Sequence, residues 1–472
     1  MRISFILFFS FFFFLFSAPA GAITISGDLF YNDLRENGLF DIRDYRMALG
    51  THQHSLGSTG HSAASSSPGT KNYLGALDVT VRLYEIDQNL AGPSCQKKML
   101  ISSTSVMPDG SYSFNLPNII DTCSSENGKA KIAIEFVLKY SDNVRKFHVV
   151  HPKAPFHILS RPPISKLIPI LLTTYRMWHP AASLKHPKKA NSPIRLPDAF
   201  LETSSPGDPT DDLAQASNVF ASIVDATRFW HVSHNIPFGK NNLTVIYPAD
   251  VKTSNSGANT MRIKKPASWF NGRLAFHEYG HVIMSRMGTI GGCGICPDGK
   301  YNRDGNSSWS NGTREYPFVA LLEGWANFSR RAIENSCNKI DDNKTSPIYP
   351  PYATVHKQGK SYPGNVSKFL CDWYDGQNDD DKSLIGQGDT FTAKSLKSMW
   401  KTMSEISTWT GTRDGLNICD FLNSYLMSEK TKLPSDKYHI LIKKISDLAS
   451  QNGIVCVISY GTTLPPTGSK WP

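Results

Sequence analysis

The sequence predicts a multidomain chain, in which an N-terminal β-sandwich precedes an α+β domain whose C-terminal lobe is mostly helical. The chain has 472 residues, more than one small domain usually contains. Its first third holds short segments of alternating apolar and polar residues, which are typical of strands, and the later part has apolar residues at helical spacing. We place the sandwich at residues 23 to 155, a proline-rich linker at 156 to 209, the α+β domain at 210 to 460 and a tail at 461 to 472.

The first 22 residues have the composition of a secretory signal peptide. Arg2 supplies a positive charge, residues 5 to 16 form an almost unbroken apolar run, and small residues follow up to Ala22. The run is shorter than the ~20 residues that a membrane-spanning helix needs. We therefore expect cleavage, a secreted (or, in a bacterium, periplasmic) protein, and no stable membrane span afterwards.

The formal net charge of +10 could indicate an affinity for nucleic acid. The basic residues are scattered, however, and their densest group is the short stretch at residues 185 to 189. No basic stripe with interleaved aromatic residues accompanies them. We expect no nucleic-acid partner.

The eight cysteines, an even number, favour disulfides in an exported chain. Cys95 and Cys123 would pair within the N-terminal region, whereas the pairing of the other six cannot be read from the sequence. Cys293 and Cys296 form a CxxC motif that also fits half of a zinc knuckle, but no second CxxC completes it. In a eukaryotic host, glycans would attach at the sequons that begin at Asn242, Asn306, Asn311, Asn343 and Asn365.

Five alternating segments predict the strands of the sandwich, at residues 23 to 27, 79 to 85, 111 to 116, 132 to 138 and 144 to 150. The stretches LGALDVTVRLYE and PDGSYSFNLP resemble transthyretin-like or B-repeat modules of surface proteins. This resemblance implies a spacer or binding module. Asp28 and Asp33 are candidate calcium ligands, with solvated loop carboxylates as the alternative.

Nine prolines between residues 161 and 209 favour a linker before the next domain. Residues 211 to 233 then have apolar residues at helical spacing, which predicts a helix. Residues 243 to 247 and 261 to 263 predict two short strands. A strand near residues 260 to 264 could pair with an extended peptide backbone.

Residues 274 to 284, which read LAFHEYGHVIM, predict a helix with a metal site. His277 and His281 are four positions apart, so a helix places both imidazoles on one face, where one zinc ion can bridge them. Glu278 would point to the open side of the metal and could take a proton from a water there. Gly280 weakens the helix slightly but lets another backbone approach closely. The alternative is an amphipathic helix whose histidines pack against neighbours.

A catalytic zinc ion needs a third protein ligand and one open position. The extended motif with a third histidine is excluded, because Met284 and Met287 occupy its glycine and histidine positions. Residues 315 to 337 predict a second helix, in which Glu323 lies in an apolar stretch. A charge there is costly unless it is paired or bound to metal. Asn327, one turn later on the same face, could hydrogen-bond a ligand histidine.

The motif FHEYGH followed by LEGWANF resembles the gluzincin, or thermolysin-like, zinc metallopeptidases. The resemblance covers about residues 210 to 380 and implies a zincin-type catalytic domain. It implies zinc bound by His277, His281 and Glu323, with Glu278 as the general base in the hydrolysis of a protein or peptide substrate.

Asn327 departs from this family, which usually has Asp at that position, a stronger partner for an imidazole. The family also uses a downstream His or Tyr to stabilise the oxyanion. Tyr374 is our candidate, with His356 and His439 as alternatives by residue type.

The acidic segment at residues 369 to 382, which reads FLCDWYDGQNDDDK, offers oxygen ligands for calcium. A solvated acidic turn is the alternative. Helical patterns at residues 395 to 406 and 438 to 449 fit the helical lobe that such peptidases place across their cleft.

We expect a secreted zinc peptidase, with an endopeptidase favoured because no acidic motif for a free amino terminus is visible. Two alternatives stay open. One is an aminopeptidase with the same metal ligands, and the other is a non-catalytic binding or adhesion protein with a structural zinc site. A structural site has no need of Glu278, which argues against the second.

Overall fold

The structure is a computed structural model that describes sixteen stretches of the chain: residues 23–32, 53–54, 73–86, 99–116, 131–142, 144–151, 173–178, 184–185, 193–201, 212–239, 241–265, 272–287, 314–337, 359–375, 395–406 and 416–456. Several expectations concern residues outside these stretches. They are the signal peptide, the tail, Asp33, His356, the sequons at Asn306, Asn311 and Asn343, and the cysteines Cys95, Cys123, Cys293 and Cys296.

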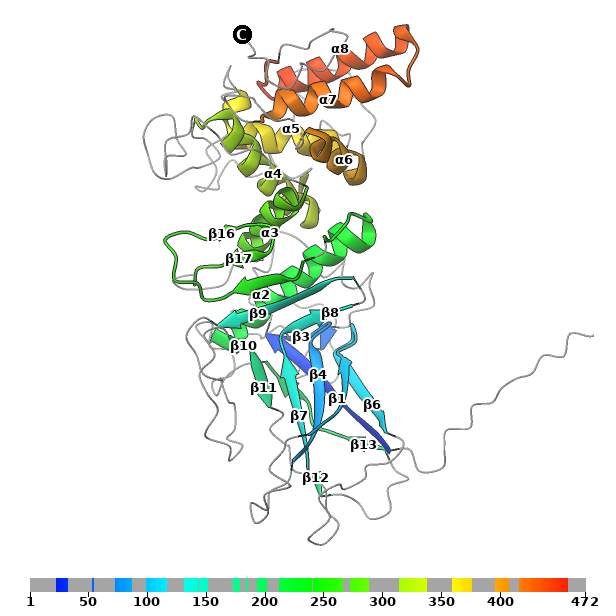
Figure 1. Ribbon diagram of the computed structural model, residues 1–472, viewed down its shortest axis with the longest axis vertical. Coiled ribbons are helices and arrows are strands. Elements are labelled where there is room, and N and C mark those ends of the chain that lie inside the picture. Colours follow the sequence, from blue (N-terminus) through cyan, green and yellow to red (C-terminus); the bar gives the residue numbers. More distant parts are fainter. Residues whose placement is uncertain are drawn as a thin grey trace, which may run out of the picture.

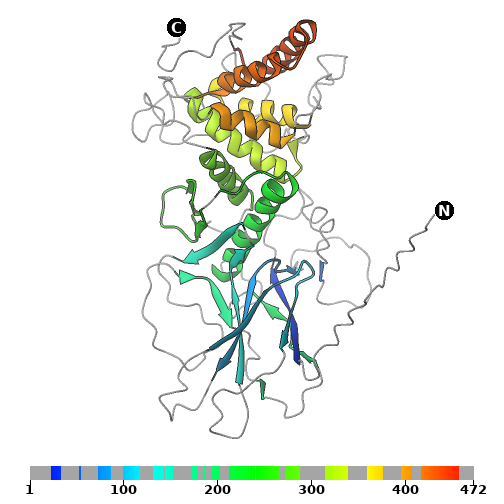
Figure 2. The same cartoon turned by 45° about the vertical axis from the view of Figure 1, so that its right-hand side comes forward.

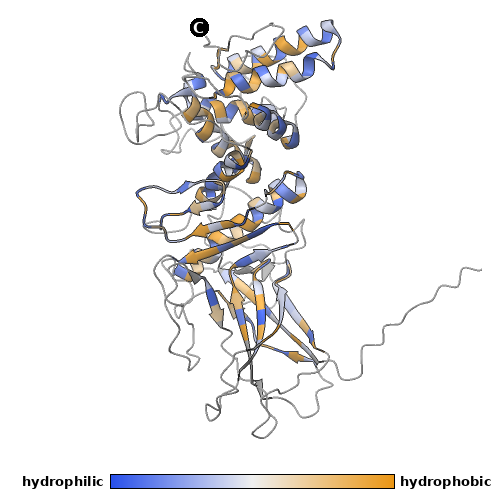
Figure 3. Ribbon diagram, in the orientation of Figure 1, coloured by the Kyte–Doolittle hydropathy of each residue, from blue (hydrophilic) through white to orange (hydrophobic). Residues whose placement is uncertain are grey.

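Strands gather at one end of the molecule and helices at the other (Figure 1). The expectation of a strand-rich N-terminal region and a helical C-terminal region is therefore confirmed. Hydrophobic and hydrophilic residues are interspersed along the strands and helices (Figure 3), as elements with one buried face require. In β6, for example, buried residues alternate with exposed or half-buried ones along the whole strand.

Two open sheets form most of the strand-rich end. In the first, β1 pairs with β3, β6, β13 and β14, and β3 pairs with β2; in the second, β4 lies between β5 and β7, which also pairs with β11 and β12. Tyr112 of β6 packs on Phe136 of β7, with ring centroids 5.5 Å apart, so the two sheets share one core. The bounds of the N-terminal strands are β1 (Ile23–Asn32), β2 (Gln53–His54), β3 (Tyr73–Gly75), β4 (Thr80–Ile86), β5 (Met99–Ser105), β6 (Ser111–Leu116) and β7 (Lys131–Val137).

The stretch that we expected to be a linker differs from that expectation in its described residues, because it supplies five short strands. β10 pairs with β9, β11 and β12 pair with β7, and β13 and β14 pair with β1. Pro193 and Pro197 flank β13 and limit its length, since proline cannot donate to a ladder. The strands are β10 (Thr173–Thr174), β11 (Arg176–Trp178), β12 (Leu184–Lys185), β13 (Ile194–Arg195) and β14 (Ala199–Phe200).

A third sheet carries the helices, and its strand order is β10-β9-β15-β17-β16, with β8 paired to β9. It joins β8 (Lys139–Ser141) and β9 (Lys146–His151), which we expected in the sandwich, to later strands by the parallel pairing of β9 with β15. β17 lies between β15 and β16, so its backbone is already paired on both sides. Within the described residues, β16 is the edge strand. The later strands are β15 (Leu243–Ile246), β16 (Asn255–Ser256) and β17 (Thr260–Arg262).

The helices begin against this third sheet and continue away from it. α2 contacts β9, and α3 contacts β16 and β17. Seen from a second direction (Figure 2), α4 lies between α3 and the later helices. The helices are α2 (Asp212–Thr227), the π-helix η1 (Arg228–Ser233), α3 (Gly272–Arg286), α4 (Pro317–Ile333), the 3-10 helix η3 (Gly359–Ser361), α5 (Pro363–Asp375), α6 (Leu396–Ile406), α7 (Ile418–Lys430) and α8 (Ser435–Gln451).

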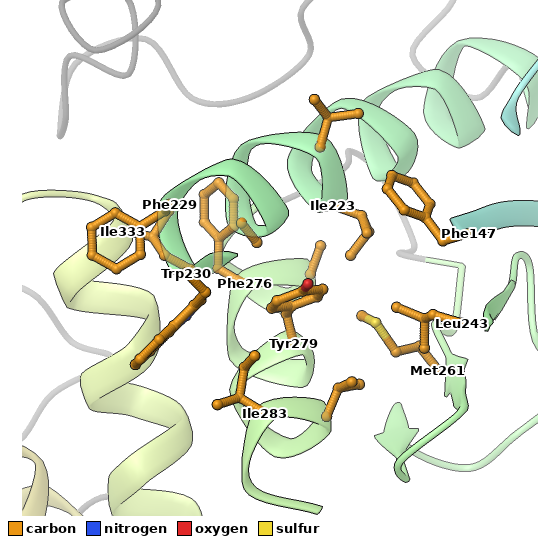
Figure 4. Close-up of a cluster of buried hydrophobic side chains, with 14 of the residues drawn as sticks. Phe147, Ile223, Phe229, Trp230, Leu243, Met261, Phe276, Tyr279, Ile283 and Ile333 are labelled. Carbon is orange, nitrogen blue, oxygen red and sulfur yellow. The ribbon is translucent and has the colours of Figure 1, made fainter. Parts of the chain in front are cut away.

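A hydrophobic cluster fills the space between the third sheet, α2, η1, α3 and α4 (Figure 4). Tyr279 of α3 lies in its middle, near Ile223 of α2 and Met261 of β17. All three side chains are fully buried. This core holds α3, the helix with the two candidate ligand histidines, firmly against the sheet.

Two disulfides join helical elements among the described cysteines. Cys337, just after α4, is bonded to Cys371 of α5, and Cys419 of α7 is bonded to Cys456, beyond α8. Cross-links of this kind are typical of exported proteins. In the part of the chain that is described, every helix is too short or too polar to cross a membrane.

Candidate metal centre

α3 and α4 bring the candidate metal ligands together. His277 and His281 lie one turn apart on α3, and Glu323 lies on α4; all three are less than 10% exposed. Among the described residues, these three side chains form a group whose ligand atoms lie close enough together to hold one metal ion. The structure thus joins two segments that are 42 positions apart in the sequence.

Three atoms of these side chains form a nearly equilateral triangle. The Nε2 atoms of His277 and His281 are 3.2 Å apart, and Glu323 Oε2 lies 3.2 Å from the first and 3.4 Å from the second. Ligands about 2.1 Å from a tetrahedral zinc ion lie about 3.4 Å from one another. The triangle therefore has the size of one face of a zinc coordination tetrahedron.

Glu323 Oε2 is buried and, within the described part of the chain, has no hydrogen bond of good geometry, although both histidine nitrogens are near it. A buried carboxylate oxygen without a hydrogen bond is costly. A cation at the centre of the triangle would satisfy this oxygen and both nitrogens. The three atoms are therefore placed better for binding one metal ion than for forming hydrogen bonds with one another.

The charge balance at Glu323 also favours a cation. Burial alone would raise the pKa of Glu323, but the neighbouring His281 and His277 outweigh it and lower the pKa to about 2. For His281, burial lowers the pKa, and the negative charges of Glu323 and Glu278 outweigh it, so the pKa is raised. The buried Glu323 carboxylate is therefore ionised near neutral pH and attracts positive charge, which a proton on His281 or a bound cation can supply.

Asn327 orients one of the two histidines. Its Oδ1 lies 3.1 Å from His277 Nδ1, and an amide oxygen only accepts, so the imidazole N–H donates to it. The proton is then on Nδ1, which leaves Nε2 with a lone pair directed at the triangle. The sequence predicted a hydrogen bond between Asn327 and a candidate ligand histidine, and the role of this bond at a metal centre stays a prediction.

Two glycines let α4 pack closely against its neighbours, Gly280 at the contact with α3 and Gly324 at the contact with α5. A Cβ on Gly280 would come within 2.8 Å of Ala326 Cα on α4, and a Cβ on Gly324 would come within 2.6 Å of Val366 on α5. Atoms cannot stand so close, so a side chain at either position would push two helices apart. The close approach expected at Gly280 is confirmed, and the partner backbone belongs to α4.

Glu278 lies on α3 beside His277, and its carboxylate accepts a hydrogen bond from the edge strand. Ser256 Oγ of β16 is 2.6 Å from Glu278 Oε2. Glu278 is almost fully buried. Sequence reasoning missed Ser256, because no motif marks it.

A second polar network connects Tyr279 of α3 to α2 and η1. Tyr279 Oη lies 2.9 Å from His231 Nε2 and 3.0 Å from Thr227 Oγ1, and His231 Nδ1 lies 2.6 Å from the Ile236 carbonyl oxygen. A carbonyl only accepts, so His231 Nδ1 carries a proton, and Tyr279 donates to Nε2. The π-helix η1 supplies this histidine, which the helical pattern of the sequence did not single out.

Tyr374, our candidate for oxyanion stabilisation, is half-buried on α5. Its ring packs against Phe328 of α4 and His234, with centroids 5.9 and 6.5 Å apart. His439 is exposed on α8, and its Nδ1 bonds to the Ser435 carbonyl of the same helix. The roles of Tyr374 and His439 in oxyanion stabilisation stay predictions.

The candidate calcium ligands receive little support. Asp28 forms an ion pair with Arg195, which explains its burial without a metal ion. The acidic segment at residues 369 to 382 lies in α5 as far as Asp375, and its remainder lies outside the described residues.

Two sequons can be compared in the described residues. Asn242 is exposed, directly before β15, whereas Asn365 Nδ2 donates to the Asn452 carbonyl at 2.9 Å. A glycan on Asn365 would break that hydrogen bond, so Asn242 is the better acceptor of the two.

Comparison with known proteins does not assign the chain to a family. No protein-family model matches the chain, and no curated protein matches it either.

Proposed function

We propose that this protein is a secreted, zinc-dependent peptidase of the gluzincin type. The observation that carries the proposal is the triangle of His277 Nε2, His281 Nε2 and Glu323 Oε2, whose edges of 3.2 to 3.4 Å fit one tetrahedral ion. Three protein ligands leave a fourth position open, as catalytic zinc sites require. A zincin-type arrangement of α3, α4 and the third sheet is part of this proposal.

Zinc is the metal that this ligand set fits best. Two imidazole nitrogens and one carboxylate oxygen at tetrahedral spacing are typical of catalytic zinc, whereas calcium and magnesium prefer six or more oxygen ligands. When bound, zinc would lower the pKa of a coordinated water and polarise the scissile carbonyl.

The protein's own residues would perform the proton transfers. Glu278 takes a proton from the attacking water and delivers it to the leaving amine. Asn327 holds the proton of His277 on Nδ1, so that Nε2 remains a ligand. An extended peptide would add to the third sheet at its edge strand β16, next to Glu278.

Export fits the same proposal. The two described disulfides are compatible with an oxidising compartment. A soluble peptidase that acts outside the cell on protein or peptide substrates is consistent with both the disulfides and the signal-like first residues.

The test is digestion of a peptide library with and without a chelator, using wild type, Glu278→Gln and Glu405→Gln. Glu405→Gln is the matched control, because Glu405 is a half-exposed residue of α6. We expect chelator-sensitive cleavage by wild type and the control, and zinc binding without cleavage by Glu278→Gln. An active Glu278→Gln protein would contradict the proposal.

The product pattern distinguishes the two alternatives. Release of single amino-terminal residues would indicate an aminopeptidase with the same ligands. Stoichiometric zinc without cleavage of any peptide would indicate a binding or adhesion protein with a structural zinc site.

A further inference from the structure

One side chain of the edge strand contacts the proposed general base directly. Ser256 Oγ lies 2.6 Å from Glu278 Oε2, the length of a hydrogen bond from a hydroxyl to an ionised carboxylate. A carboxylate only accepts, so the hydroxyl of Ser256 donates. This bond links β16 to α3.

The strand that carries Ser256 is itself held in place. Ser256 pairs with Met261 across the hairpin of β16 and β17, and Gly257 N donates to the Thr260 carbonyl at 2.9 Å to close the turn. Arg286 of α3 donates from Nε to the Ala258 carbonyl at 2.6 Å. The hairpin is therefore attached to α3 at two points, Glu278 and Arg286, two turns apart.

The two residues of β16 face opposite sides of the sheet. Ser256 shares its face with Met261, which is fully buried toward α3. Asn255 shares the other face with Arg262, and both are exposed. Cross-strand partners share a face and successive residues alternate, so Asn255 is a matched control on the same strand that points away from Glu278.

We propose that Ser256 is a positioning residue for Glu278. Its hydrogen bond restricts the rotamers of a long side chain and occupies one carboxylate oxygen, which leaves the other to accept the proton of the attacking water. Because Ser256 belongs to the edge strand, one element both receives the peptide backbone and orients the base. This inference rests on the proposed function and extends it to a residue outside the zinc motif.

The experiment compares Ser256→Ala, Ser256→Thr and the control Asn255→Ala. Loss of the hydrogen bond leaves Glu278 in several orientations, so we expect kcat of Ser256→Ala to fall about 10-fold or more. KM and the zinc content should stay within about twofold of wild type, because peptide and metal contacts are unchanged. Ser256→Thr keeps the hydroxyl and should restore kcat, and Asn255→Ala should resemble wild type.

A second readout does not depend on activity. In crystal structures of the metal-free proteins, the Glu278 carboxylate should occupy one position in wild type and Ser256→Thr, and be displaced in Ser256→Ala. An undisplaced carboxylate in Ser256→Ala would overturn the inference. So would an unchanged kcat in Ser256→Ala, or an equal loss in Asn255→Ala. If wild type cleaves no peptide, the proposed function fails, and the crystal structures alone decide on Ser256.

Discussion

Gly280 of α3 lies directly against Ala326 of α4, where the two helices that carry the candidate metal ligands meet. A Cβ at position 280 would stand 2.8 Å from Ala326 Cα. The approach brings Glu323 to within 3.4 Å of both histidine Nε2 atoms. The proposed zinc site thus depends on a backbone contact as much as on its candidate ligands.

Gly280→Ala should therefore damage the site without changing a ligand. The added methyl group must separate α3 from α4, which we expect to cost about 1–3 kcal/mol of the free energy of unfolding and to weaken zinc binding. Urea denaturation and zinc titration measure the two effects. Gly257→Ala is the control, because a Cβ there meets open space. Equal zinc affinity in wild type and Gly280→Ala would show that the close approach does not set the site.

Asn327→Ala should lower zinc affinity by about 10- to 100-fold, because the His277 imidazole loses the acceptor that orients it. Competition with a fluorescent zinc chelator measures this change. Asn327→Asp keeps an acceptor oxygen and should bind zinc at least as tightly as wild type. If Asn327→Ala bound zinc as wild type does, the hydrogen bond would have no role in the metal centre.

His231 should make the metal-free protein less stable in mild acid. Burial lowers the pKa of His231 to about 4, against about 6.5 in an unfolded chain. As the pH falls from about 6.5 to 4, the unfolded state takes up the proton first, so stability falls, by up to about 3 kcal/mol.

Urea denaturation of wild type, His231→Gln and the exposed control His439→Gln across this pH range measures the His231 contribution. The difference between variants is needed, because burial raises the pKa of Asp420 to about 6, and this carboxyl acts in the opposite direction over the same range. We expect wild type and His439→Gln to lose more stability toward acid than His231→Gln. If the free energy of unfolding changed with pH in the same way in all three proteins, His231 would not be buried in its neutral form.

Local spacing was enough to place the two candidate ligand histidines on one helix face. His277 and His281 needed only the geometry of one helix, and α3 formed as expected. The position of Glu323 relative to them depends on how α3 packs on α4, which helical periodicity does not contain. The apolar surroundings of Glu323 indicated the residue but not its distance.

Long-range strand pairing was harder to predict. β9 alternates like the other N-terminal strands, yet it pairs with β15 rather than with the sandwich strands. Strands of two or three residues, such as β13 and β14, are too short to have a period, so a proline-rich linker was the natural interpretation. Ser256 was missed for a related reason, since only the hairpin brings it to Glu278.

Zinc stoichiometry in a ligand variant tests the metal centre most directly. Wild type and Glu405→Gln, dialysed against zinc and analysed by atomic spectroscopy, should each retain one zinc ion per chain. Glu323→Gln keeps the shape of the side chain but loses its charge, so it should retain almost none. A full equivalent of zinc in Glu323→Gln would contradict the metal centre proposed here.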